Sequence, residues 1–335
     1  MLNKLRGAVI DFTGLFLFGL AMCLFSYKET IQLMFQLPAS IYKMNTIFFS
    51  ILIEAFPFVL LGVIISGLIQ IFITEDHIKR WIPKNKYLAI TMGCLLGAVF
   101  PGCECGIVPI IRRLLNKGVP IYAATGFMLT GPLINPLVII STYIAFGNDL
   151  KIAFLRMGLG FIIALIIAIV MSLSIKMKPL RSSTHKKIKR DHHDFKASLL
   201  TKISGAMIHA TDEFFYMVKY LILGILFAAF VQTYISYETL FSLGEGEAVA
   251  TGLMMVLAYL LSVCSEADAF IAASFSNLFP ISALLGFLIY GPMIDLKNTL
   301  MLLSVFKTKF VAVFFVVVTV IVFSVVLLFQ GFYHR

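Results

Sequence analysis

Two short polar clusters interrupt otherwise apolar stretches of this sequence. One reads Phe100-Pro101-Gly102-Cys103-Glu104-Cys105-Gly106, and the other reads Val263-Cys264-Ser265-Glu266-Ala267-Asp268. Thiolates select soft ions such as Cu(I), Zn²⁺ or a trivalent metalloid, and an ionisable side chain in an apolar segment is by default a candidate for function. The candidate solute-binding residues of the clusters are Cys103, Glu104, Cys105, Cys264, Glu266 and Asp268, and the candidate metal ligands are Cys103, Cys105 and Cys264.

Structural roles are an open alternative for these side chains. Asp and Glu favour the first turn of a helix, so each carboxylate can serve to cap a half-helix. Free cysteine is among the residues most often buried as a small apolar group, and Cys-x-Cys is weaker evidence for a metal than a paired Cys-x-x-Cys pattern. Cys23 and Cys94 have apolar neighbours and are expected to be packing residues.

Two further interruptions carry a Gly-Pro pair. They read Gly131-Pro132-Leu-Ile-Asn135-Pro136 and Gly291-Pro292-Met-Ile-Asp295. A broken membrane helix frees backbone carbonyls and exposes a half-helix N-terminus, which makes a polar site with few charges. Asn135 and Asp295 are therefore candidate solute-binding residues, or alternatively caps of the helices that follow. The predicted structural breaks are Pro101, Gly102, Gly131, Pro132, Gly291 and Pro292.

The amino-acid composition indicates whether water or lipid surrounds the segments that carry these clusters. The chain has 335 residues, of which 60% are hydrophobic and 13% are charged, whereas a soluble domain has roughly 25% charged residues. We predict an all-α polytopic membrane protein. The net charge of +10 comes from basic blocks between apolar runs, a pattern typical of cytoplasmic loops and not of nucleic-acid binding. Five cysteines in mostly apolar surroundings indicate free thiols.

The elements that must position the clusters follow from the apolar runs. About 20 apolar residues cross the hydrocarbon core as a helix, and the predicted full spans are 8–25, 46–73, 152–175, 214–237 and 310–331. Interrupted apolar regions occupy 87–115, 118–147, 248–279 and 280–306. Because both flanks of 87–115 are basic and its arms are short, we expect a re-entrant hairpin. Glu54, in a long span before Pro57, is expected nearer the outer interface.

Two parts of the sequence resemble each other at an offset of about 160 residues. The segment from Gly62 to Gln70 aligns with Gly224 to Gln232, and Phe127 to Asn135 aligns with Phe287 to Asp295. With three crossings in each copy, the second copy would be inverted, as in many secondary transporters. The predicted divisions are an N-terminal signal-anchor span and outer loop (1–43), repeat 1 (44–175), a basic cytoplasmic linker (176–202) and repeat 2 (203–335).

The basic linker and the N-terminal segment each allow a further prediction. The linker contains His185, His192 and His193, which fit either a solvated basic segment near anionic lipid headgroups or a metal-sensing loop. Lys4 and Arg6 precede the first apolar run, so we expect a retained anchor with the N-terminus inside.

The four motifs, in this order, resemble those of the predicted-permease family that includes the ArsP organoarsenical efflux proteins and the bacterial YraQ and YcgR proteins. The resemblance extends from about residue 44 onward. It implies a multi-pass permease of the bacterial cytoplasmic membrane without an ATPase domain. The ArsP members export trivalent organoarsenicals through membrane cysteines, and in this sequence that role would fall to Cys103, Cys105 and Cys264.

These observations favour a secondary transporter that exports a small solute by alternating access, with Glu104, Glu266 or Asp268 taking up a proton. The expected partners are membrane lipid, a metal ion or metalloid as solute, and a partner membrane subunit. We expect no enzyme activity, cofactor or nucleic acid. Two alternatives are a membrane thiol oxidoreductase that uses Cys103 and Cys105, and a channel-like or lipid-handling subunit of a larger complex.

Overall fold

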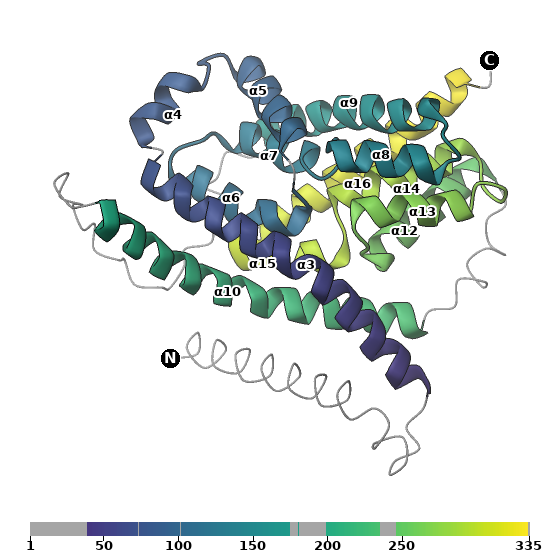
Figure 1. The fold of residues 1–335 in the computed structure, drawn as a ribbon. Helices are drawn as coiled ribbons and strands as arrows, with labels where there is room; N and C mark the ends of the chain where they lie inside the picture. The colour runs from purple at the N-terminus through teal and green to yellow at the C-terminus, as the bar shows by residue number, and fades with distance from the viewer. Residues whose placement is uncertain are drawn as a thin grey trace, which may run out of the picture.

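The computed structural model describes residues 39–72, 74–100, 102–174, 180, 199–234 and 246–333. These residues form helices joined by short connections, together with one isolated bridge between Leu180 and Phe306. The predicted all-α class is confirmed (Figure 1). The predictions for span 8–25, Cys23, Pro101 and the three linker histidines concern residues outside the described ranges.

Four long helices set the frame of the molecule. They are α3 (Ala39–Phe72), α9 (Leu150–Ser174), α10 (Leu199–Tyr234) and α16 (Thr308–Tyr333). Each contains a segment long and apolar enough to cross a membrane, namely Ser40–Gln70, Leu150–Ser174, Phe214–Tyr234 and Thr308–Gly331. Four of the five predicted full spans are thereby confirmed. The chain is a multi-pass membrane protein.

Shorter helices lie between the long ones. The first group is α4 (Glu75–Trp81), α5 (Lys86–Val99), α6 (Glu104–Asn116), α7 (Ile121–Thr130) and α8 (Pro136–Ala145). The second group is α12 (Glu247–Leu261), α13 (Ser265–Ser274), α14 (Ile281–Met293) and α15 (Leu296–Val305). Apart from α4, the order is one long helix, four short helices and one long helix, twice over. This order agrees with the two expected repeats, whereas their inversion stays a prediction.

The helices stop at the interruptions that the sequence contains, with one difference. Among the described residues, these breaks fall at 100 and 102–103, at 131–135, at 262–264 and at 294–295. The predicted break at Gly291 and Pro292 is corrected, because both residues belong to the last turn of α14. Proline removes only its own N–H donor, and the N–H of Ile294 still donates to the Tyr290 carbonyl at 3.0 Å. The helix therefore continues through Pro292 and opens immediately before Asp295.

Half-helices from one half of the chain pack against the other half. Helix α6 contacts α15, and α13 contacts α8, while α3 and α10 lie side by side along the molecule (Figure 1). Glycine permits the tightest of these approaches, since a Cβ on Gly62 of α3 would clash with the backbone of Gly106 in α6. A Cβ on Gly224 of α10 would lie 3.0 Å from the Cα of Lys297 in α15. The N-termini of α6 and α15 are thereby held together.

Candidate functional site

The first polar cluster starts helix α6. After α5 ends at Val99, the backbone is extended at Phe100 and again at Cys103, which is the N-cap residue of α6. The Cys103 carbonyl accepts hydrogen bonds from the N–H groups of Gly106 (3.1 Å) and Ile107 (3.3 Å). Glu104 therefore stands in the first turn, where the helix dipole favours a carboxylate. Its side chain is nonetheless buried, with 3% of the residue exposed.

A buried lysine joins three of the interrupted segments. The Nζ atom of Lys297 lies 2.9 Å from Glu104 Oε1 and 2.9 Å from Asp295 Oδ2, and all three side chains are buried. The same ammonium donates hydrogen bonds to the carbonyl oxygens of Ser262 (2.8 Å) and Val263 (3.3 Å). One cation thus links the break before α6, the break before α13 and the start of α15.

The second polar cluster is shaped by an unusual backbone turn. Ser262 has φ 48° and ψ 39°, which is a left-handed conformation that few residues other than glycine adopt. Its hydroxyl accepts a hydrogen bond from the N–H of Leu296 at 3.0 Å. The side chain of Gln232 donates to the Leu261 carbonyl. These contacts hold the end of α12 so that its last carbonyls face Lys297.

A second buried cation lies near the second cluster. Arg156 of α9 is 1% exposed and donates to the Thr142 hydroxyl at 2.6 Å and to the Ser265 carbonyl at 3.0 Å. Asp268, on the same half-helix as Ser265, attracts Arg156 electrostatically. Among the described residues, neither carboxylate oxygen of Asp268 accepts a hydrogen bond. Gly291 leaves room for it, because a Cβ there would lie 2.8 Å from Asp268 Oδ2.

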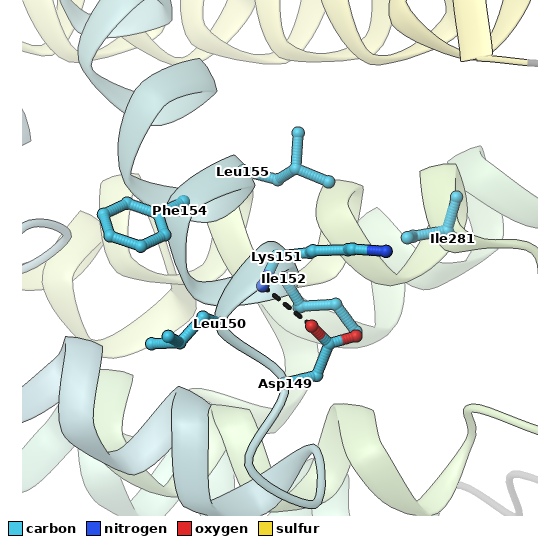
Figure 2. A pocket seen from close by; sticks show the side chains of 7 residues that line it. All are labelled: Asp149, Leu150, Lys151, Ile152, Phe154, Leu155 and Ile281. Atoms are coloured by element: carbon cyan, nitrogen blue, oxygen red, sulfur yellow. Dashed lines mark hydrogen bonds between the residues drawn. The ribbon is translucent and has the colours of Figure 1, made fainter.

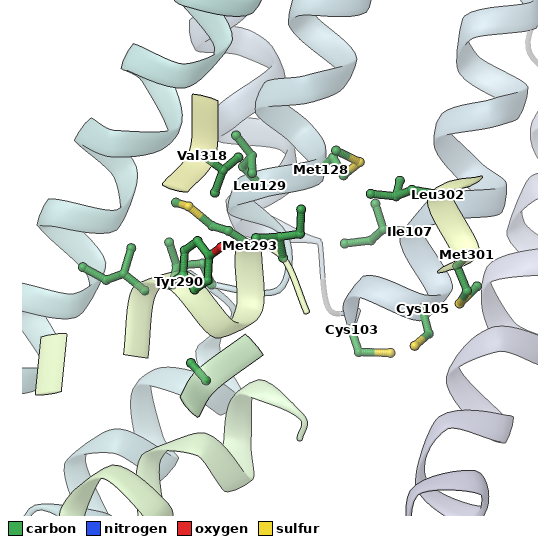
Figure 3. Close-up of a cluster of buried hydrophobic side chains, with 14 of the residues drawn as sticks. Cys103, Cys105, Ile107, Met128, Leu129, Tyr290, Met293, Met301, Leu302 and Val318 are labelled. Atoms are coloured by element: carbon green, nitrogen blue, oxygen red, sulfur yellow. The ribbon is translucent and has the colours of Figure 1, made fainter. Parts of the chain in front are cut away.

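The three candidate cysteines meet at one small cavity. Its volume is about 20 Å³, and its lining comprises Ile51, Glu54, Ala55, Phe58, Cys103, Glu104, Cys105, Cys264 and Lys297. The side chains of Cys103 and Cys105 lie close together (Figure 3). A water molecule needs roughly 10–15 Å³ of such space. The cavity therefore has room for about one water and is closed to larger solutes.

The arrangement of the thiols bears on the metal prediction. All four described cysteines are free thiols. Among the described residues, no three His, Cys, Asp or Glu side chains are close enough together to hold a metal ion. The Cys264 sulfur instead accepts a hydrogen bond from the Ala267 N–H at 3.4 Å. A trigonal thiolate site would require these segments to move.

The remaining predicted residues have simpler roles in this structure. Asn135 Oδ1 accepts from the Leu137 N–H at 2.8 Å and caps α8, and Asp295 Oδ1 accepts from the Asn298 N–H at 2.6 Å and caps α15. Asn135 does not line the cavity. Glu266 is half-buried in the first turn of α13. Cys94 is fully buried against Ile90 and Ala168, as expected of a packing residue.

A larger pocket lies elsewhere in the molecule. It has a volume of about 490 Å³ and opens beside the start of α9, where Asp149, Leu150, Lys151 and Phe154 form much of its wall (Figure 2). Asp149 Oδ1 accepts from the Lys151 N–H at 2.8 Å, which caps α9. None of the candidate solute-binding residues lines this pocket.

Sequence reasoning missed both buried cations. Lys297 follows Asp295 by two residues, and Arg156 lies inside the apolar run 152–175. An ionisable residue within an apolar span is by default functional and needs a partner, so the same rule that selected the carboxylates would also have selected these bases. The structure brings Glu54 to the cavity that Cys264 also lines, whereas its depth in the membrane stays a prediction.

Comparisons with known proteins were made for the whole chain. A family model described as "Predicted permease" matches residues 40–331. The UPF0718 protein YcgR of Bacillus subtilis is 48% identical over 297 residues, which cover 88% of this chain and 99% of that protein. A Streptococcus mutans protein, named as a subunit of a two-component membrane permease complex, is 42% identical over 279 residues (83% and 92%).

More distant similarity extends to an archaeal protein. A UPF0718 protein of Methanocaldococcus jannaschii is 29% identical over 119 residues, which cover 35% of this chain and 32% of that protein. No solved structure matches this chain.

Proposed function

This chain belongs to the family of predicted permeases, and we propose that it is a secondary transporter that exports a small soft solute by alternating access. The solute class is a soft metal ion, a metalloid or a trivalent organoarsenical. It binds between the two halves at the thiols of Cys103, Cys105 and Cys264, whose sulfur atoms suit such ions. The protein works in the bacterial cytoplasmic membrane with its N-terminus inside.

The buried Lys297 ammonium is the observation that carries this proposal. It bonds to Glu104 from one half, to Asp295 from the other, and to the carbonyls that end α12. Interrupted helices that meet between two repeats are where secondary transporters bind solutes and ions. Because the adjoining cavity has room for about one water, this arrangement corresponds to an occluded state. Opening toward either side requires the Lys297 contacts to break on that side.

The proposal is tested by flux in proteoliposomes. The purified protein is reconstituted and uptake of a trivalent monomethyl arsenical is followed, after a screen of metals and metalloids on the wild type. We expect Glu104→Gln to abolish flux while the protein stays folded, because Lys297 keeps its bond to Asp295. Asp149→Asn is the matched control, since asparagine preserves the α9 cap away from the cavity. Wild-type flux in both Glu104→Gln and Glu266→Gln would show that the site is elsewhere.

A partner membrane subunit is part of the proposal. The Streptococcus mutans relative bears the name of a subunit of a two-component complex, and its similarity covers most of both chains. We expect this protein to migrate in native electrophoresis, after extraction in mild detergent, as a species larger than one copy. Full flux from the purified chain alone would show that no partner is needed.

A further inference from the structure

Four oxygen atoms surround the ammonium of Lys297. Two belong to carboxylates, Glu104 Oε1 and Asp295 Oδ2, each at 2.9 Å. Two are backbone carbonyls at the end of α12, those of Ser262 at 2.8 Å and Val263 at 3.3 Å. Carboxylates together with carbonyls freed by a broken helix are the ligands that bind Na⁺ in transporters with interrupted helices. Hard cations in general take such oxygen ligands.

We propose that the Lys297 ammonium is a tethered cation that fills a site otherwise suited to a free monovalent cation, and that it thereby locks the two halves together without Na⁺ or K⁺. The charge of the surroundings supports this assignment. Two buried carboxylates face one ammonium, and Glu54 lines the same cavity. Glu104 Oε2 is buried and has no hydrogen-bond partner among the described residues, so the site keeps unused capacity to bind a cation.

The backbone around Lys297 leaves the ammonium little freedom to leave. A Cβ placed on Gly224 would lie only 3.0 Å from the Cα of Lys297, so α15 packs closely against α10 at this point. The left-handed turn at Ser262 aims its carbonyl at Nζ, and the Ser262 hydroxyl accepts from the neighbouring Leu296 N–H. Separation of α6 from α15 would remove the Glu104 ligand, and separation of the end of α12 from α15 would remove the two carbonyls. The Asp295 carboxylate, at the start of α15, would stay beside the ammonium.

This inference builds on the proposed permease function, because the tethered cation closes the path between the halves. It differs in what is measured. The test reads the binding of a simple cation to the folded protein and not solute flux, so either idea can fail while the other stands.

Thermal unfolding of Lys297→Ala in detergent tests the inference. The midpoint is measured in choline chloride and after replacement of choline by Na⁺, K⁺ or methylammonium at constant ionic strength. We expect the wild type to show the same midpoint in all salts. We expect Lys297→Ala to unfold at a lower temperature in choline and to be stabilised in a saturable manner by at least one of the small cations, because a ligand that binds only the folded state raises its stability. The absence of any saturable rescue would overturn the proposal.

Two further variants show whether the rescue belongs to this site. Lys297→Met keeps most of the side-chain volume, so the cation has no room and we expect no rescue. The double variant Lys297→Ala with Glu104→Gln lacks the negative charge of the Glu104 carboxylate. We therefore expect its rescue to require an at least several-fold higher cation concentration. Equal rescue in all three variants would contradict the assignment.

The double variant also decides the case if Lys297→Ala alone cannot be purified. Uncompensated carboxylates would then be the cause of its instability, and removal of one of them with Glu104→Gln should return folded protein in choline chloride. A double variant no more stable than the single one would show that Lys297 does not serve to neutralise these oxygens.

Discussion

Replacement of Arg156 by leucine is expected to destabilise the protein more than any other single change outside the cavity. The substitution removes the donors to the Thr142 hydroxyl and the Ser265 carbonyl, and it takes away one of the cations that attract the buried Asp268 carboxylate. Loss of a buried hydrogen bond to a charged group costs about 1.5–3 kcal/mol, so the loss of these two corresponds to a midpoint lowered by on the order of 10 °C. This shift is measured by thermal unfolding in detergent, with the exposure of buried thiols as the signal.

The same experiment has an internal control and a rescue. Lys151→Leu alters a base on the same helix whose side chain is exposed, and it should move the midpoint by only a degree or two. Asp268→Asn in the Arg156→Leu background removes the stranded carboxylate and should restore a large part of the loss. If Arg156→Leu unfolds like the wild type, or if Asp268→Asn restores nothing, the pair does not stabilise the fold in the way described.

A large effect on arsenical transport is expected at Cys105. Its thiol is fully buried beside that of Cys103 and faces the cavity, so the two sulfurs form a ready pair for a trivalent arsenical. A hydroxyl is a poor ligand for a soft ion, and we expect Cys105→Ser to lower arsenical flux by at least about tenfold, which corresponds to roughly 1.4 kcal/mol. Flux into proteoliposomes is the measurement.

Cys94→Ala is the matched control for this substitution. Cys94 is equally buried but packs against Ile90 and Ala168 away from the cavity, so its flux should stay at the wild-type level. Undiminished arsenical flux in Cys105→Ser would remove the thiols from the transport mechanism. It would leave the permease function itself untouched, because another solute could use the same cavity.

Much of the fold could be predicted because the membrane restricts what an apolar sequence can form. Runs of about 20 apolar residues must be helices that satisfy their own backbone, and the four described full spans follow from that rule. The breaks were also readable, since Cys103 and Asn135 both stand where a helix restarts. Only Gly291 and Pro292 were misplaced, because a proline removes a single donor and the helix can close the turn beyond it.

The partners of the site residues could not be predicted in the same way. The local sequence pattern identified Glu104 and Asp295 as carboxylates that are costly to bury within a membrane. The cation that neutralises both is Lys297, which contacts Glu104 only because α6 packs against α15. Arg156 likewise reaches Ser265 across the boundary between the halves. Such pairings depend on tertiary contacts between distant segments, and periodicity along one segment carries no information about them.

We propose that the cavity between the two interrupted clusters is the path of the solute and opens alternately to either side. It is tested most directly by alkylation of the wild-type protein with a membrane-impermeant maleimide, applied to right-side-out and to inside-out vesicles and quantified for each cysteine by peptide mass spectrometry. We expect the cavity cysteines Cys103, Cys105 and Cys264 to react from both sides and Cys94 to react from neither. Cavity cysteines that react from one side only, or that stay as protected as Cys94, would contradict it.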